Sequence, residues 1–222
     1  LYLLSLEDVM RVALAGVAAA AALATLHTLP SASARIASAT AFCAALGLSA
    51  SLPDWSTQRL AAGLFRSRSP LPHSFDGPER FFASRRNPKE LFYQDDPVAS
   101  IAVQEYGEKE GRPDRAVVSN GKSDGTTWAD YPTMALAGLL PALFAEHHAS
   151  SFVIGYGLGV TVGELAALPG MQRVRVAEIS RGVIRAAPFF DYANLGASQR
   201  PNVEIAQEDA YRSLIRSNER FD

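Results

Sequence analysis

Three glycines and one acidic residue follow two short apolar runs in the second half of the chain. Residues 152–154 lead into a loop with Gly155, Gly157 and Gly159, and a second apolar run ends at Glu178, about 20 residues further on. Glycine has no Cβ, so this loop can turn sharply and let a ligand approach the backbone. A carboxylate at a strand tip can accept hydrogen bonds from both hydroxyls of a ribose. The order of strand, glycine loop, helix, strand and acid predicts a nucleotide-binding βαβ unit.

The loop lacks the features of two common phosphate sites. No Gly-Lys-Ser/Thr follows it, as a Walker loop requires, and the full spacing of the dinucleotide fingerprint is missing. The pattern therefore favours an adenosine ligand without a pyrophosphate. The alternative is that the glycines only end a strand and that Glu178 is a solvated charge.

Composition narrows the classes of partner. The 222 residues include 21 Lys and Arg and 23 Asp and Glu, a net charge of −2, so bulk charge gives no reason to expect a nucleic-acid partner. The single cysteine, Cys43, excludes an internal disulfide, and its apolar surroundings predict a small hydrophobe. The four histidines have no metal-ligand spacing with cysteine or acids, so no metal site is expected.

Residues 1–52 are rich in Ala, Leu and Ser and contain two uncharged runs that Arg35 separates. A membrane-spanning helix needs about 20 mostly apolar residues, and alanine-rich faces suit close helix packing in a membrane. We expect two transmembrane helices here; two buried helices of a soluble bundle are the alternative. The arginines that follow, Arg59, Arg66 and Arg68, place the remainder on the cytoplasmic or matrix side.

The rest of the chain divides into three parts. Residues 53–90 hold five prolines and few apolar runs, which predicts a connector. Residues 91–129 hold short β-rich runs, which predicts a small antiparallel sheet with turns at 107–114 and 120–121. Residues 130–222 alternate helix and strand patterns, with helices expected over 160–168 and 181–192, the second ended or bent by Pro188, and are predicted as a Rossmann-like adenosyl-binding domain.

The predicted fold class is therefore α/β, with a Rossmann-like domain after a small antiparallel sheet and N-terminal hydrophobic helices. Asp130 is placed to cap the first helix of the Rossmann-like domain, Pro132 lies in its first turn and Pro141 is expected to kink it.

Residues 220–222 have the pattern of a strand's first residues, and the chain begins with Leu rather than Met. We therefore expect a fragment of a longer polypeptide.

Short motifs of the chain resemble those of the spermidine/spermine synthases, in the same order: Ser119-Asn120-Gly121-Lys122, Asp130, Gly138-Leu139-Leu140-Pro141, the glycine loop, Glu178 and Glu208-Asp209-Ala210. The resemblance covers residues 90–222. Upstream, residues 55–66 resemble the junction in a bacterial branch that fuses a membrane domain to this enzyme. That resemblance supports the membrane interpretation of residues 1–52.

The resemblance implies an aminopropyltransferase that uses neither a metal nor another cofactor. In that family, decarboxylated S-adenosylmethionine gives its aminopropyl group to a polyamine and leaves methylthioadenosine. Acids position the amine and accept its proton, because the neutral amine attacks the carbon beside the sulfonium. Self-association and a larger protein assembly both stay open.

The resemblance assigns adenosyl contacts to Gly155, Gly157, Gly159, Glu178 and Asp209. Within that set, Glu178 holds the ribose hydroxyls and Asp209 faces the adenine amino group. Asp130 matches an acidic position near the amine pocket. The alternatives are a turn acid at a strand end for Asp209 and a helix cap for Asp130.

Two positions depart from the family. Leu158 stands where the soluble enzymes have an Asp that binds the aminopropyl ammonium, and Met134-Ala135 stand where they have a His-Glu pair. The family's central catalytic acid is expected beyond Asp222, so no residue here is assigned as catalytic. Two other functions stay open: a catalytically decayed, membrane-anchored subunit of a larger assembly, and an S-adenosylmethionine-dependent methyltransferase.

Overall fold

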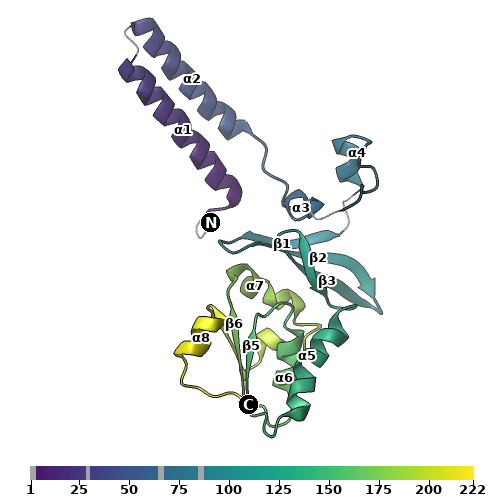
Figure 1. Cartoon of the computed structure of the whole chain (residues 1–222). Coiled ribbons are helices and arrows are strands. Elements are labelled where there is room, and N and C mark those ends of the chain that lie inside the picture. Colours follow the sequence, from purple (N-terminus) through teal and green to yellow (C-terminus); the bar gives the residue numbers. More distant parts are fainter. Residues whose placement is uncertain (1–3, 29–30, 65–67, 85–87) are drawn as a thin grey trace. The chain divides into compact units, whose positions relative to one another are not determined.

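The computed structural model describes residues 4–28, 31–64, 68–84 and 88–222. The chain forms two compact units, Leu1–Ser56 and Thr57–Asp222 (Figure 1). The first unit consists of two helices, and the second contains two β-sheets with their helices.

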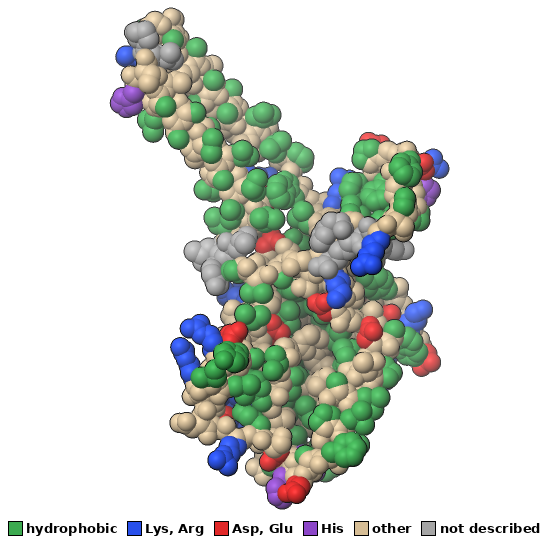
Figure 2. All heavy atoms as spheres, viewed as in Figure 1, with side chains coloured by type: hydrophobic (Ala, Val, Ile, Leu, Met, Phe, Trp, Pro, Cys, Tyr) green, Lys and Arg blue, Asp and Glu red, His purple; other side chains and the backbone are tan. Residues whose placement is uncertain are grey.

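The first unit is a pair of contacting helices, α1 (Leu6–Thr28) and α2 (Ala32–Ser51). The hydroxyls of Thr25 and Ser38 form a hydrogen bond between them. Both helices are long and apolar enough to cross a membrane, by length and composition alone, and Figure 2 shows hydrophobic side chains over much of their surface. Cys43 on α2 is free and exposed on this apolar helix.

The predicted connector is partly helical and partly packed. It contains α3 (Thr57–Leu60) and α4 (Pro78–Ala83). Just after α3, Ala61 is buried in an apolar cluster with residues of the small sheet. Part of this stretch, including Arg66 and the end of the synthase-like junction, lies outside the described residues.

Four antiparallel strands form the small sheet in the order β1-β2-β3-β4: β1 (Lys89–Asp95), β2 (Ser100–Lys109), β3 (Arg112–Ser119) and β4 (Lys122–Thr126). Two-residue turns with positive φ join β2 to β3 at Glu110-Gly111 and β3 to β4 at Asn120-Gly121. Such turns match the twist of a hairpin. The predicted turn at 107–114 is therefore too long, because both strands continue into it.

The second sheet is parallel, in the order β5-β6-β7, and helices alternate with its strands. Its elements and their neighbours are α5 (Tyr131–Phe144), β5 (Ser150–Ile154), α6 (Val160–Ala167), β6 (Arg173–Glu178), α7 (Arg181–Ala186), the 3-10 helices η2 (Ala187–Phe190) and η3 (Ala197–Gln199), β7 (Val203–Gln207) and α8 (Ala210–Arg216). The predicted α/β class is confirmed.

The end of the chain differs from prediction, whereas helix α5 contains Pro141 and continues to Phe144. Residues 220–222 form no strand, although the Asp222 N–H donates to the Ser150 carbonyl over 3.1 Å. Phe221 also packs on Phe152, with 5.2 Å between ring centroids. The end of the chain therefore contacts β5 but does not form a strand of the sheet.

One hydrophobic core joins the two sheets. Ile101 and Val103 of the small sheet belong to the same buried cluster as Val160, Val176 and Phe190 of the parallel-sheet region. Helix α7 contacts strands of both sheets (Figure 1). The small sheet is therefore part of the framework that positions the carboxyl edge of the parallel sheet.

Candidate functional site

The carboxyl ends of the three parallel strands bring the predicted adenosyl residues to one edge. Ile154 pairs with Ala177, and Glu178 pairs with Gln207, so the strands end nearly level. The Gly155 N–H extends this pairing by donating to the Ala177 carbonyl over 2.9 Å. In open parallel sheets, ligands bind in the crevice beyond this edge.

Glu178 is a buried acid at this edge that backbone donors hold in place. It is 6% exposed, and its carboxylate accepts two backbone N–H groups. Oε2 accepts from Tyr156 over 2.8 Å, and Oε1 accepts from Ser180 over 2.7 Å. A carboxylate oxygen can accept two hydrogen bonds, so each oxygen keeps capacity for a ribose hydroxyl. Glu178 is not the solvated charge of the alternative interpretation.

The three loop glycines have different surroundings. All have positive φ, at 80°, 55° and 75° for Gly155, Gly157 and Gly159. A Cβ on Gly155 would stand 3.9 Å from Glu178 Oε2, whereas no described atom lies within 4 Å of a Cβ on Gly157. Gly155 therefore lies beside Glu178, and Gly157 faces open space. A Cβ on Gly159 would lie 2.4 Å from the Tyr156 hydroxyl, so Gly159 is required by packing.

Two buried polar residues that the sequence analysis missed support the loop. Asn194 is 1% exposed, and its Nδ2 donates to the Leu158 carbonyl over 2.8 Å and to the Tyr156 hydroxyl over 3.3 Å. Burial, with a smaller contribution from Asp191, raises the pKa of Tyr156, so the phenol is neutral at physiological pH. A tyrosine within a glycine-rich loop was the signal available in the sequence. Asn194 gave none, because it comes from a distant segment.

Ile179 is a second contribution to the edge that was missed. It follows Glu178 directly and is 50% exposed although it is a large apolar side chain. Ligand sites combine apolar surface with a few well-placed polar groups. Ile179 follows Glu178 in sequence and supplies exposed apolar surface at the end of β6.

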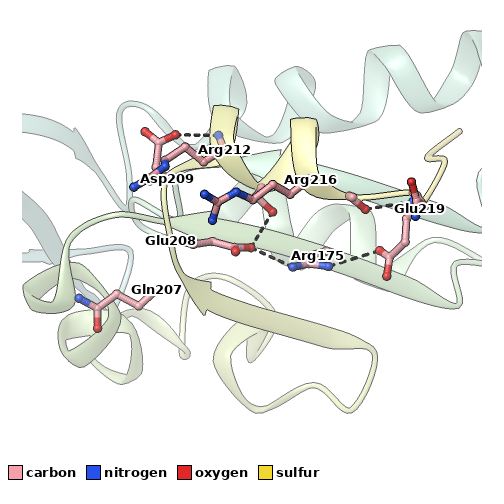
Figure 3. Close-up of a pocket in the computed structure, with 10 residues that line it drawn as sticks. Arg175, Gln207, Glu208, Asp209, Arg212, Arg216 and Glu219 are labelled. Atoms are coloured by element: carbon pink, nitrogen blue, oxygen red, sulfur yellow. Dashed lines mark hydrogen bonds and ion pairs between the residues drawn. The ribbon is translucent and has the colours of Figure 1, made fainter.

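Asp209 lies two residues beyond the end of β7, at the same edge. It is exposed, and its Oδ1 caps α8 by accepting the Arg212 N–H over 2.8 Å. Figure 3 shows Asp209 at a cavity of about 650 Å³ beneath α8, with Arg175, Glu208 and other polar residues around it. The cap explains the orientation of Asp209 without a ligand, as the turn-acid interpretation expected.

The same cavity contains an ion-pair network on β6. Arg175 contacts Glu208 over 3.0 Å and Glu219 over 3.4 Å (Figure 3). The Ser213 hydroxyl and Arg175 hold the pKa of Glu208 below its ordinary value. Glu208, which precedes Asp209 in the synthase-like motif, thus forms an ion pair with Arg175 on β6 and accepts a hydrogen bond from Ser213 on α8.

Asp130 occupies the N-cap position of α5, but its side chain does not cap the helix. Its Oδ2 instead accepts the Thr126 N–H over 2.7 Å and closes the turn after β4. The predicted side-chain cap is therefore wrong. The carboxylate is exposed and has capacity for further hydrogen bonds.

The residues that depart from the synthase pattern meet at Gly125. A Cβ on Gly125 would stand 3.0 Å from Leu158 Cδ1, 3.5 Å from Met134 Sδ and 3.7 Å from the Cβ of Asp130. Leu158 is 2% exposed. The two substituted positions thus form a joint apolar contact beside Asp130. Among the described residues, no group of three or more His, Cys, Asp and Glu could hold a metal ion.

No protein-family profile and no curated protein sequence matches the chain. Solved structures do match its fold. A spermidine synthase in complex with the transition-state analogue AdoDATO aligns with a TM-score of 0.53 and 17% identity, over 60% of this chain and 45% of that one. The spermidine synthase from Thermotoga maritima aligns with a TM-score of 0.53 and 17% identity, over 60% of this chain and 46% of that one. The chain spans less than half of these synthases, and the likeness establishes a shared fold.

Proposed function

We propose that this chain is the adenosyl-binding part of a spermidine synthase-like protein. Glu178 is the observation that carries the proposal. It is a buried carboxylate at the carboxyl edge of a parallel sheet, fixed by the Tyr156 and Ser180 N–H groups. Each carboxylate oxygen is left with capacity for one hydroxyl, which suits the vicinal diol of a ribose.

The surroundings of Glu178 support an adenosine rather than a nucleotide. Gly155, beside Glu178, carries no side chain, and the exposed Ile179 that follows Glu178 is proposed to pack on the base. Asp209 stands beyond the next strand, where its free lone pairs can accept an exocyclic amino N–H. The loop lacks a Walker lysine, so a phosphate group has no dedicated partner there.

The reaction proposed for the whole protein is aminopropyl transfer. The neutral amine of a polyamine attacks the carbon bonded to the sulfonium, the C–S bond breaks toward sulfur, and methylthioadenosine leaves. The attacking nitrogen then loses a proton to a carboxylate that acts as the base. Within this chain, Asp130 is the acid proposed to face the amine, and no resident cofactor or metal is proposed.

The apolar contact at Gly125 supports a second candidate, a non-catalytic subunit of a larger assembly. Leu158 is buried and packs with Met134 beside Gly125, so neither position can pair with an ammonium group. Burying an unpaired charge there would be strongly unfavourable. Such a subunit would keep adenosine binding and lose aminopropyl transfer.

We also propose that α1 and α2 attach the protein to a membrane, with the second unit on the cytoplasmic or matrix side. The length and composition of both helices support the attachment. The arginines after the second helix support a cytoplasmic or matrix location of the second unit, because positive residues are retained on that side of the membrane.

Calorimetric titration with three ligands tests the proposal and separates the candidates. Methylthioadenosine, decarboxylated S-adenosylmethionine and S-adenosylmethionine are each titrated into the purified chain. Saturable binding of methylthioadenosine supports the adenosyl site. Equal or tighter binding of the decarboxylated sulfonium favours the transferase, and much weaker binding favours the non-catalytic subunit. Tightest binding of S-adenosylmethionine points to a methyltransferase, and no binding of any ligand to folded protein refutes the adenosyl site.

A further inference from the structure

Asp96, in the turn between β1 and β2, is a buried carboxylate with four hydrogen bonds. It is 6% exposed. Oδ1 accepts the N–H groups of Val98 and Ala99 over 2.8 and 3.0 Å, which shapes its own turn. Oδ2 accepts the Ser180 hydroxyl over 2.6 Å and the Gly182 N–H over 3.0 Å, both at the start of α7. One carboxylate thus joins the small sheet to the parallel-sheet region.

Ser180 connects Asp96 to Glu178. Its hydroxyl donates to Asp96, while its backbone N–H donates to Glu178 Oε1 over 2.7 Å. The same hydroxyl accepts the Val183 N–H over 3.1 Å and so caps α7. A continuous path of hydrogen bonds therefore leads from the small sheet to the carboxylate at the candidate site.

Close packing fixes this path in place. A Cβ on Gly182 would lie 2.8 Å from Ile101 Cγ1 and 3.3 Å from Asp96 Oδ2. Helix α7 therefore begins directly against the small sheet, and no side chain fits between them. The Ser180 hydroxyl is bonded to Asp96, and the backbone N–H of the same residue is bonded to Glu178. A shift of Asp96 therefore moves the N–H group that Glu178 accepts.

We propose that Asp96 is a positioning residue of the adenosyl site, acting on Glu178 through Ser180. The inference rests on the proposed function of Glu178 but concerns a residue of the other sheet. It assigns the small sheet a direct part in ligand affinity. Asp96 itself has all four hydrogen bonds within the protein and does not touch the ligand.

The first test follows the amide groups without any ligand. Amide hydrogen exchange is measured at Tyr156 and Ser180 in the wild-type chain and in Asp96→Asn, Ser180→Ala and Asp114→Asn. Asp114 is the matched control, a 9%-exposed carboxylate of the same sheet that accepts the Thr127 hydroxyl over 3.3 Å. Exchange at both amides should be at least about 10-fold faster in Asp96→Asn and Ser180→Ala, and unchanged in Asp114→Asn.

The second test measures methylthioadenosine affinity in the same four proteins and in the double variant Asp96→Asn with Ser180→Ala. Asp96→Asn and Ser180→Ala should each weaken it about 10-fold, and the double variant should bind no more weakly than either single variant. Asp114→Asn should bind like the wild type. Should Asp96→Asn fail to fold, Ser180→Ala carries the comparison.

The two tests separate the inference from the proposed function. Faster exchange in the Asp96 and Ser180 variants, without methylthioadenosine binding to the wild type, would uphold the positioning of Glu178 and refute the adenosyl function. Unchanged exchange at Tyr156 and Ser180 would overturn the inference, whatever the wild type binds. Equal effects of Asp114→Asn and Asp96→Asn would also overturn it, because both would then act through general destabilisation.

Discussion

Glu178 owes its orientation to backbone donors that come from two segments of the chain. The Tyr156 N–H belongs to the glycine loop, and the Ser180 N–H belongs to the start of α7. The sequence was sufficient to select Glu178, because an acid at a strand end after a glycine loop is a local pattern. Its donors were not predictable, since their positions depend on how α7 packs. Asp130 shows the reverse case, in which a good capping residue bonds the preceding turn instead.

Glu90 is an acid whose burial should be visible in the pH dependence of stability. Burial raises its pKa although the Thr57 hydroxyl lowers it, and its Oε2 has no hydrogen-bond partner among the described residues. The folded protein thus binds the Glu90 carboxyl proton more tightly than the unfolded chain does. The stability contributed by this protonation is complete below the ordinary glutamate pKa of about 4.3. It is lost as the pH rises through the raised pKa of Glu90 in the folded protein.

The Glu90→Gln variant removes this titration. Relative to the wild type, its unfolding free energy should be most favourable at neutral pH, and the advantage should fall as the pH approaches about 4. Urea unfolding of both proteins at several pH values measures the difference. A difference that is constant from pH 7 to 4 would show that Glu90 has an ordinary pKa.

At the scale of elements, periodicity and turn residues predicted the parallel strands and α6 nearly to their ends. Residues 160–168 were expected to be helical, and α6 is Val160–Ala167. Pairing between strands set the end of β2, which continues to Lys109 because β3 pairs with it. In the helical pattern over 181–192, which Pro188 was expected to end or bend, α7 ends at Ala186. Proline lacks the N–H that an α-helix needs, so a 3-10 turn follows.

Two glycines of the loop should respond differently to alanine. Both have positive φ, which costs a residue with a side chain about 1–2 kcal/mol. At Gly157 this is the whole expected loss of stability, because no described atom lies within 4 Å of the new Cβ. At Gly159 the Cβ would overlap the Tyr156 ring and hydroxyl, which should add about 1–3 kcal/mol. Denaturant unfolding of Gly157→Ala and Gly159→Ala checks this; equal losses would contradict the packing role.

At the scale of the whole molecule, one apolar core supports the carboxyl edge from both sheets. Ile101 and Val103 on β2 share that core with Val176 on β6. Short apolar, β-rich runs indicated each strand separately, but no local pattern indicates which sheet faces meet. That contact places Asp96 beside α7, which explains why Asp96 was absent from the predicted site.

The apolar surface of α1 should decide where the protein resides. Val17 and Leu23 are 69% and 58% exposed on this helix. A lysine at the centre of a spanning helix costs about 2.5–3.5 kcal/mol, so Val17→Lys with Leu23→Lys should release the protein from membranes. The measurement is alkaline extraction of membranes from expressing cells.

Val98→Lys is the matched control, because Val98 is 51% exposed in the second unit. This variant should stay in the membrane pellet with the wild type. Recovery of the wild type itself in the soluble fraction would contradict membrane attachment. The helix pair would then be a soluble element with another partner.

The most direct test of the central claim is calorimetric titration of methylthioadenosine into wild type and Glu178→Gln. Glu204→Gln is the control, because Glu204 is an exposed acid of the same sheet, paired with Arg173 over 2.7 Å. Hydrogen bonds to a charged group contribute about 1.5–3 kcal/mol each, so Glu178→Gln should weaken binding about 10- to 100-fold while Glu204→Gln binds normally. Equal affinity of the wild type and a folded Glu178→Gln variant would contradict the account.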